Sequence, residues 1–349
     1  MKKETITTVT KAVASAIQEH GNKILKNKLN TEFSKIKNSY KHLGNNITEA
    51  LKKFLEKGNI DYQEVYSRVK DFDSFYNKSN KYNDPFNEIE DICGVRIICY
   101  YASDIDKINK IINNEFNVIE QQDISDRFNV NEFGYRSHHF VVKIKESWTA
   151  APNYRDLENF KAEIQVRTIS MHAWAEVEHK LNYKSVKEIP HKFKRKISLL
   201  SAKFEEIDEQ FDTLRNGIEE YQNEITQKIK ETNSFDLEQE FNIDTFSAYL
   251  NFLSPNEVFD QFLINQTFDF LFGHYVTFKV IKESLDLTKP FKKEVLEDFS
   301  KLDSFEKEEV GYPLFIWFSV DIFKERNLEN TDDEYKKLIK KWRGNIFNI

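Results

Sequence analysis

Four short clusters of charged and aromatic residues fall in order between positions 66 and 184. The first places Lys70, Ser74 and Lys78 four residues apart, with Arg68 just before them. On a helix these three would share one face, where two ammonium groups offset the charge of a polyphosphate and the hydroxyl donates a hydrogen bond to it. An ordinary solvated helix face has the same spacing, so this cluster alone leaves both interpretations open.

The second cluster, residues 91–96 (DICGVR), sets an acid directly before a strongly apolar run. A carboxylate at the end of a buried strand can hold Mg²⁺ while the ion keeps several of its waters. Asp91 is therefore a candidate metal ligand. Capping of a helix or turn is the alternative role for an acid at this position.

The third cluster, residues 134–139 (GYRSHH), stands directly before a predicted strand. Tyr135 offers a flat ring on which a base can stack, a contact worth about 1–3 kcal/mol in single-stranded nucleic acid complexes. Arg136 and His139 offer donors to phosphate or ribose. Adjacent histidines on a strand point to opposite faces, and no cysteine or further histidine stands at ligand spacing, so a zinc site is not expected.

The fourth cluster joins an alternating segment, residues 163–168, to a helical one, residues 171–184. On a strand, three polar residues share the face opposite Ile164 and Val166: Glu163, Gln165 and Arg167. On the helix, three further polar residues fall at i, i+4 and i+7 on one face: His172, Glu176 and His179. The HExxH order of a zinc metalloprotease is absent.

The periodicity around these clusters predicts the elements that position them. Residues 10–57 have helical periodicity, interrupted by the GNN sequence at 44–46, and residues 62–80 are predicted to form a further helix. A buried strand over 95–101, a helix over 105–114, a strand over 117–121 and alternating strands over 138–145 and 161–168 follow. Strands interleaved with helices predict an α/β domain over about residues 60–190.

A heptad pattern follows this domain. Ten apolar residues alternate at four- and three-residue steps: Phe193, Ile197, Leu200, Phe204, Ile207, Phe211, Leu214, Ile218, Tyr221 and Ile225. This seam predicts a long helix that either packs within the chain or forms a homo-oligomeric coiled coil. Residues 231–349 hold 17 of the 30 Phe and are predicted to form a helical domain with an aromatic core.

The 349 residues carry a net charge of −7, but the charge is uneven. Residues 1–57 have 12 Lys against 5 Glu, and residues 231–349 have 14 basic against 23 acidic residues. The two ends are either solvated surfaces or a phosphate-binding end and an acidic end that covers it. No apolar run approaches the length of a membrane span, and Cys93 and Cys99 are too far apart along a strand for a disulfide, so a reduced cytoplasmic protein is expected. Four segments are predicted: 1–58, 59–190, 191–230 and 231–349.

Taken together, the motifs RxKxxxSxxxK, DICGVR, GYRSxH, EIQVRT and HAWAEVEHKLxYK resemble the synthetase domain of the RelA/SpoT alarmone synthetases over about residues 60–190. The resemblance implies a nucleotidyltransferase-like α/β (α+β) fold, a mixed sheet flanked by helices, here with helical extensions at both ends. It implies transfer of pyrophosphate from ATP to a ribose 3′-hydroxyl.

The same resemblance implies roles by motif position. Arg68, Lys70, Ser74 and Lys78 would bind ATP, and Asp91 would ligate Mg²⁺. Glu163 would complete the metal site or activate the hydroxyl. Tyr135, Arg136 and His139 would bind the acceptor. The supporting residues would be Gln165, Arg167, His172, Glu176, Glu178 and His179.

The sequence leaves the acceptor open. Alarmone-making members usually have Lys and Asn, which help to read guanine, where this chain has Asn131 and Phe133. The first hypothesis is a single-function synthetase that makes a (p)ppGpp-type alarmone from ATP and GDP or GTP, or the adenine analogue from an adenine nucleotide. The second is a toxic relative that modifies the 3′-terminal adenosine of tRNA, with an antitoxin-like acidic tail. The third is an inactive regulator. No histidine is followed by Asp, so the hydrolase activity of bifunctional relatives is not expected.

Overall fold

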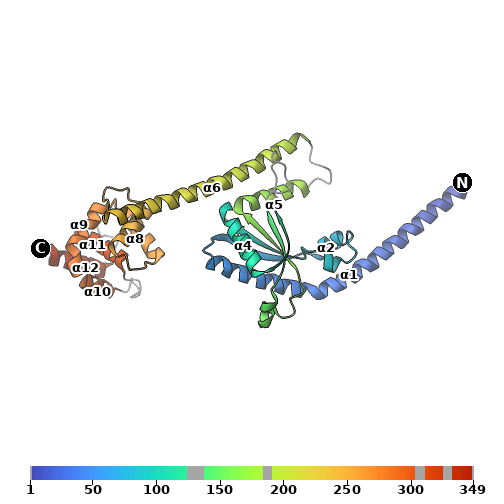
Figure 1. Ribbon diagram of the computed structural model, residues 1–349, viewed down its shortest axis with the longest axis horizontal. Helices are drawn as coiled ribbons and strands as arrows, with labels where there is room; N and C mark the ends of the chain where they lie inside the picture. The colour runs from blue at the N-terminus through green and yellow to red at the C-terminus, as the bar shows by residue number, and fades with distance from the viewer. Residues whose placement is uncertain (1, 124–136, 184–190, 303–310, 325–331, 348–349) are drawn as a thin grey trace. The chain divides into compact units, whose positions relative to one another are not determined.

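A mixed five-stranded sheet, in the order β1-β2-β5-β4-β3, forms the centre of the N-terminal part of the chain (Figure 1). Its strands are β1 (Tyr62–Val69), β2 (Cys93–Cys99), β3 (Asn117–Asp123), β4 (His138–Lys143) and β5 (Ala162–Thr168). Strands β2 and β5 are parallel, and the other neighbours are antiparallel. This computed structural model describes residues 2–123, 137–183, 191–302, 311–324 and 332–347. The predicted mixed sheet flanked by helices is confirmed.

Helices, together with short 3₁₀ segments, make up the rest of the regular structure among the described residues. In the first 232 residues they are α1 (Lys2–Lys57), α2 (Phe72–Ser79), α3 (Pro85–Glu88), α4 (Ile105–Glu115), α5 (Ile169–Tyr183) and α6 (His191–Thr232). After them come α7 (Ile243–Leu253), α8 (Gln261–Gly273), α9 (Phe278–Thr288), α10 (Lys292–Phe299), α11 (Tyr312–Phe323) and α12 (Asp333–Phe347). Among the described residues, no helix combines the length and apolarity needed to cross a bilayer.

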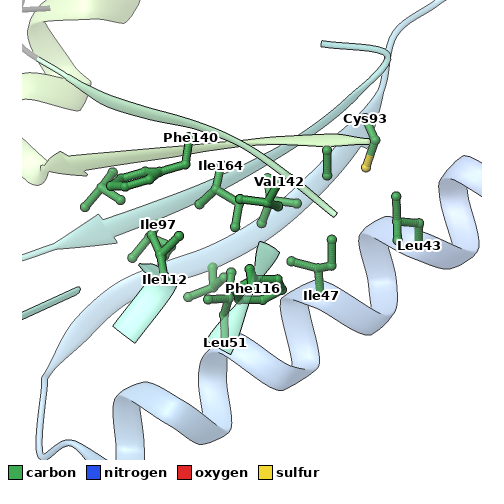
Figure 2. Close-up of a cluster of buried hydrophobic side chains, with 14 of the residues drawn as sticks. Leu43, Ile47, Leu51, Cys93, Ile97, Ile112, Phe116, Phe140, Val142 and Ile164 are labelled. Carbon is green, nitrogen blue, oxygen red and sulfur yellow. The ribbon is translucent and has the colours of Figure 1, made fainter. Parts of the chain in front are cut away.

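One face of the sheet is buried by α1 and α4. Figure 2 shows Leu43, Ile47 and Leu51 of α1 directed towards sheet residues such as Ile164, with Phe116 beside them. The core positions of β2 and β5 alternate with polar ones, because successive side chains of a strand point to opposite faces. Burying one face in this way leaves Arg96 of β2 on the opposite face, where the site lies.

Two expectations for this region are wrong. Residues 62–69 form strand β1, and helix α2 begins only after Asp71, whose carboxylate caps it by accepting a hydrogen bond from the Ser74 N–H at 2.8 Å. The backbone of residues 62–69 pairs with β2, and this long-range pairing outweighs the local helical pattern. The predicted break at 44–46 is also absent, since α1 runs through it.

The continuity of α1 has a packing reason at Gly44. A Cβ at this position would lie 2.9 Å from the Cβ of Ser67 and 3.1 Å from the Sγ of Cys93. The helix approaches β1 and β2 so closely that only glycine fits without a shift. Burial of the neighbouring Leu43 and Ile47 offsets the low helix propensity of glycine. Cys93 and Cys99 are both free and buried, as expected.

The chain divides into two compact units, Met1–Leu214 and Arg215–Ile349. In the second unit, α7 to α12 pack round aromatic side chains, among them Phe299 and Phe318, whose rings stack with centroids 3.9 Å apart. The heptad segment forms one helix, α6, as expected. Most of its seam is exposed, at Phe193, Leu200, Ile207, Phe211, Leu214, Ile218 and Tyr221. Assembly through this seam stays a prediction, and so do the bounds of the four predicted segments.

Candidate active site

A cavity of about 180 Å³ opens on the face of the sheet opposite α1. Its lining comes from β1, the start of α2, β2 and β5: Tyr66, Arg68, Val69, Lys70, Asp71, Ser74, Asp91, Gly94, Val95, Arg96, Glu163 and Gln165. The register of the strands explains this gathering. Arg68, Gly94 and Glu163 form one row across three strands, and Tyr66, Arg96 and Gln165 form the next row. Because Gly94 has no side chain, space remains between Arg68 and Glu163.

Asp91 is held by two lysines at one end of this cavity. The Nζ of Lys70 donates to Asp91 Oδ2 at 2.6 Å, and the Nζ of Lys78 lies 3.0 Å from Oδ1. Burial acts to raise the pKa of the Asp91 carboxyl, but the hydrogen bonds and charges of Lys70 and Lys78 outweigh it, so the pKa is lowered. Asp91 is therefore an ionised carboxylate at neutral pH.

Glu163 is fixed by its neighbours on β4 and β5. The Nδ1 of His139 lies 2.9 Å from Oε1, and the Nε2 of Gln165 donates to Oε2 at 2.8 Å. Burial acts to raise the pKa of Glu163, but the hydrogen bond and charge of His139 and the hydrogen bond from Gln165 lower it overall. The charge of Asp91 acts on Glu163 in the raising direction, which places the two carboxylates within electrostatic reach of each other.

Arg96, whose role could not be predicted from its motif, connects three elements around the site: β1, β5 and α5. Its Nη1 donates to Tyr66 Oη at 2.7 Å and to Glu176 Oε1 at 3.2 Å, while Nη2 donates to Gln165 Oε1 at 3.5 Å. The Nδ1 of His172 lies 3.5 Å from the same Nη1. Alternation along β2 could have identified this residue, since an arginine two positions after Gly94 shares its face.

Three of the predicted supporting residues, Arg167, Glu178 and His179, do not line the cavity. Arg167 is buried, and it donates from Nη2 to Gln165 Oε1 at 2.7 Å and from Nε to Ser137 Oγ at 3.3 Å. Glu178 and His179 lie on α5, away from the cavity lining. Tyr135 and Arg136 lie outside the described residues.

The predicted phosphate-binding stripe is not a single helix face. Arg68 belongs to β1 and Lys70 follows it, so only Ser74 and Lys78 are on α2. Lys70 and Lys78 nevertheless converge, because both reach Asp91. Ser74 Oγ donates to Asp71 Oδ2 at 2.8 Å, which makes it part of the helix cap in this structure. Lys70 and Lys78 meet at Asp91 because the chain turns from β1 into α2 between them.

The carboxylates of Asp91 and Glu163 suit an ion such as Mg²⁺, which is usually shared with substrate phosphates, better than a metal bound by protein ligands alone. No group of three or more His, Cys, Asp or Glu side chains suited to a metal occurs within the described part of the chain. Mg²⁺ is usually bound by one or two carboxylates together with substrate phosphates. Asp91 and Glu163 supply two ionised carboxylates on one cavity, beside cations that suit phosphate. The arrangement can therefore hold a phosphorylated substrate together with its counterion.

A mixed sheet with two carboxylates and lysines gathered at one cavity has the composition of a phosphate-binding site, and comparisons with known proteins identify the family. A profile described as "Region found in RelA / SpoT proteins" matches residues 67–188. The chain is 33% identical over 171 residues to GTP pyrophosphokinase YjbM of Bacillus subtilis (strain 168), covering 48% of this chain and 78% of that protein. The chain belongs to the RelA/SpoT family, which confirms the resemblance.

Two further known proteins are similar to part of the chain. GTP pyrophosphokinase YwaC of Bacillus subtilis (strain 168) is 33% identical over 141 residues, 38% of this chain and 64% of that protein. The crystal structure of small alarmone synthetase 1 from Bacillus subtilis aligns with 27% identity and a TM-score of 0.46, covering 54% of this chain and 99% of that one.

Proposed function

We propose that this protein is a pyrophosphotransferase that moves the β,γ-pyrophosphate of ATP to the 3′-hydroxyl of GDP or GTP, giving a (p)ppGpp-type product. The observation that carries the proposal is that Asp91, Glu163 and Lys70 line one cavity, with Lys78 paired to the same Asp91. Membership of the RelA/SpoT family and relatives named GTP pyrophosphokinase support pyrophosphate transfer that involves a guanine nucleotide.

In the proposed reaction the 3′-oxygen forms a bond to the β-phosphorus of ATP. The bond from that phosphorus to the oxygen bridging the α-phosphate breaks, AMP leaves with the electron pair, and the hydroxyl proton passes to solvent. Such a transfer needs charge compensation and alignment more than covalent help. A bound Mg²⁺ would supply part of that compensation on the phosphate oxygens.

Each charged residue at the site is assigned one part of this reaction. Asp91 and Glu163 would hold Mg²⁺, and Lys70 and Lys78, now paired with Asp91, are the cations assigned to the phosphates. A general base works best when its pKa lies near the operating pH. The lowered pKa of Glu163 therefore favours a role as metal ligand and hydrogen-bond acceptor for the 3′-hydroxyl. Arg68 lies opposite Gly94 on the neighbouring strand, and Arg96 lies opposite Gln165, so both arginines would lie beside the bound nucleotide.

Labelled ATP tests both the reaction and the acceptor. The full chain is incubated with γ-labelled ATP, Mg²⁺ and either GDP, GTP or deacylated tRNA. Label in GDP or GTP supports the proposal, whereas label in tRNA alone replaces the acceptor with the 3′-terminal adenosine. Transfer to tRNA would also weaken steeply with salt, because several phosphate contacts release counterions. No transfer under any condition favours the inactive regulator.

Variants of the two carboxylates test the site itself. Glu163→Gln and Asp91→Asn each remove one negative charge with little change in shape. Both are expected to abolish transfer to whichever acceptor the wild type uses. Full turnover in both variants contradicts the assignment of Asp91 and Glu163, whatever the acceptor.

A further inference from the structure

The cavity of the active site holds a third carboxylate, which has no part in the proposed reaction. Asp71, the residue directly before α2, lines the cavity together with the two carboxylates already assigned, Asp91 and Glu163. A negative side chain in a cavity that takes a triphosphate opposes the binding of that substrate, because like charges repel.

The carboxylate of Asp71 is engaged at the start of α2. One of its oxygens, Oδ1, accepts a hydrogen bond from the backbone N–H of Ser74 at 2.8 Å, and the other, Oδ2, accepts one from the Ser74 hydroxyl at 2.8 Å. These hydrogen bonds from the Ser74 N–H and hydroxyl lower the pKa of Asp71, so the group is ionised at neutral pH. Both donors of Ser74 are therefore occupied by a carboxylate of the protein itself.

Ser74 is also one of the residues that line the cavity. Donors in the first turn of a helix suit phosphate, because they can form hydrogen bonds to it and because the positive end of the helix dipole favours negative charge. A phosphate and the Asp71 carboxylate are both anionic acceptors, so they compete for the Ser74 hydroxyl. The hydroxyl must leave Asp71 Oδ2 before it can donate to a phosphate.

We propose that Asp71 is a positioning residue that acts through Ser74: it holds the Ser74 hydroxyl in its own hydrogen bond and thereby weakens the binding of ATP. The inference rests on the proposed function, since it concerns the nucleotide assigned to the same cavity. Oδ1 caps α2, while Oδ2 withholds one donor from the phosphates. Asp71 therefore stabilises the start of the helix and lowers the affinity for ATP at the same time.

Asp71→Asn separates these two effects, because asparagine keeps one oxygen and has an amide nitrogen in place of the other. The remaining oxygen can still accept the Ser74 N–H, and asparagine caps helices about as well as aspartate, so Tm should change little. The amide nitrogen is a donor and releases the proton of the Ser74 hydroxyl for a phosphate. The affinity for ATP should rise about threefold to tenfold, which corresponds to one net hydrogen bond.

Calorimetric titration of the full chain with α,β-methylene ATP and Mg²⁺ measures this affinity without turnover. Tighter binding by Asp71→Asn supports the inference, because a lost helix cap would weaken binding and lower Tm. Equal or weaker binding overturns it. A wild-type chain that binds neither this analogue nor ATP contradicts the proposed function and the inference with it. Asp71→Ser, a second good cap without a carboxylate, should show the same gain and repeats the test.

Asp73→Asn is the matched control. Asp73 lies in the first turn of α2 but does not line the cavity, and its carboxylate pairs with Lys26 at 2.8 Å. The variant removes the same charge from the same end of the helix without releasing the Ser74 hydroxyl, so the affinity for the analogue should not change. An equal gain in Asp73→Asn would show a general effect of net charge and overturn the role of Asp71.

Ser74→Ala tests whether the gain comes through the hydroxyl. When Asp71→Asn is added to Ser74→Ala, no hydroxyl remains to be released, so most of the gain in affinity should disappear. A gain of the same size with and without the hydroxyl would show that Asp71 acts by its charge alone, and would overturn the competition for Ser74.

Discussion

Replacing Asp91 by asparagine tests the charge arrangement of the active site most directly. The carboxylate lies 2.6 Å from the Nζ of Lys70 and 3.0 Å from that of Lys78, and Asp91→Asn leaves both ammonium groups beside a neutral amide. Breaking a buried pair costs about 3–5 kcal/mol, and breaking an exposed pair costs about 0–1 kcal/mol. The side chains of Asp91 and Lys70 are 26% and 20% exposed, so we expect a loss of about 1–3 kcal/mol.

Thermal unfolding and labelled-ATP transfer measure the two consequences. For a unit of this size, each kcal/mol lowers Tm by about 2–4 °C. If Asp91 holds Mg²⁺ as proposed, transfer should fall by at least about a hundredfold, since a metal-bound charge contributes several kcal/mol to stabilising the transition state. The pKa of Asp91 is lowered on folding, so its stabilisation is complete above the unfolded value of 3.8 and is lost as the pH falls through the lower folded value. The Tm difference should therefore persist down to about pH 4.

A second aspartate–lysine pair provides the control. Asp73 lies 2.8 Å from the Nζ of Lys26, but their side chains are 76% and 44% exposed. Solvent screens this pair, so Asp73→Asn should change the free energy of unfolding by less than about 1 kcal/mol and leave transfer unchanged. Equal stability losses in the two variants would refute the reasoning from burial. Unchanged transfer in Asp91→Asn would refute the role assigned to the carboxylate.

Four further substitutions probe the site and the fold. His139→Leu removes the hydrogen bond and charge that lower the pKa of Glu163, so the acid limb of the transfer rate should move to higher pH; an unchanged pH profile contradicts the pairing. Arg96→Met removes charged hydrogen bonds to three elements around the cavity, so it should lower kcat/KM for ATP by about tenfold or more. An unchanged kcat/KM in steady-state kinetics contradicts this role of Arg96. Gly44→Ala should lower Tm because the added Cβ has no room. Gly217→Ala has open space around it and should stabilise α6 by about 1 kcal/mol. A Tm change of the same sign in both variants would exclude the packing argument.

Part of the site could be predicted from local pattern alone. Alternation along β5 placed Glu163 and Gln165 on one face, and the structure puts both on the same cavity. The heptad spacing predicted one long helix, and α6 is continuous from His191 to Thr232. These successes share a cause: the period of a strand or helix is fixed by backbone geometry, so it can be recognised within a few consecutive residues.

Other features depended on residues distant in sequence. Residues 62–69 form a strand because β2, some thirty residues further on, supplies its hydrogen-bond partners. The lysines at 70 and 78 could be recognised as suited to phosphate, but their convergence on Asp91 required the junction of β1 and α2. Arg96 acquires its contacts only when Tyr66, Gln165 and Glu176 come together from three elements.

The sequence by itself determined the family, the order of most strands and helices, and the residue types available for binding phosphate and magnesium. The tertiary structure decided which of those residues meet and which charges they neutralise. The physical reason is that periodicity and propensity act over neighbouring residues, whereas strand pairing, burial and charge pairing depend on distances in space.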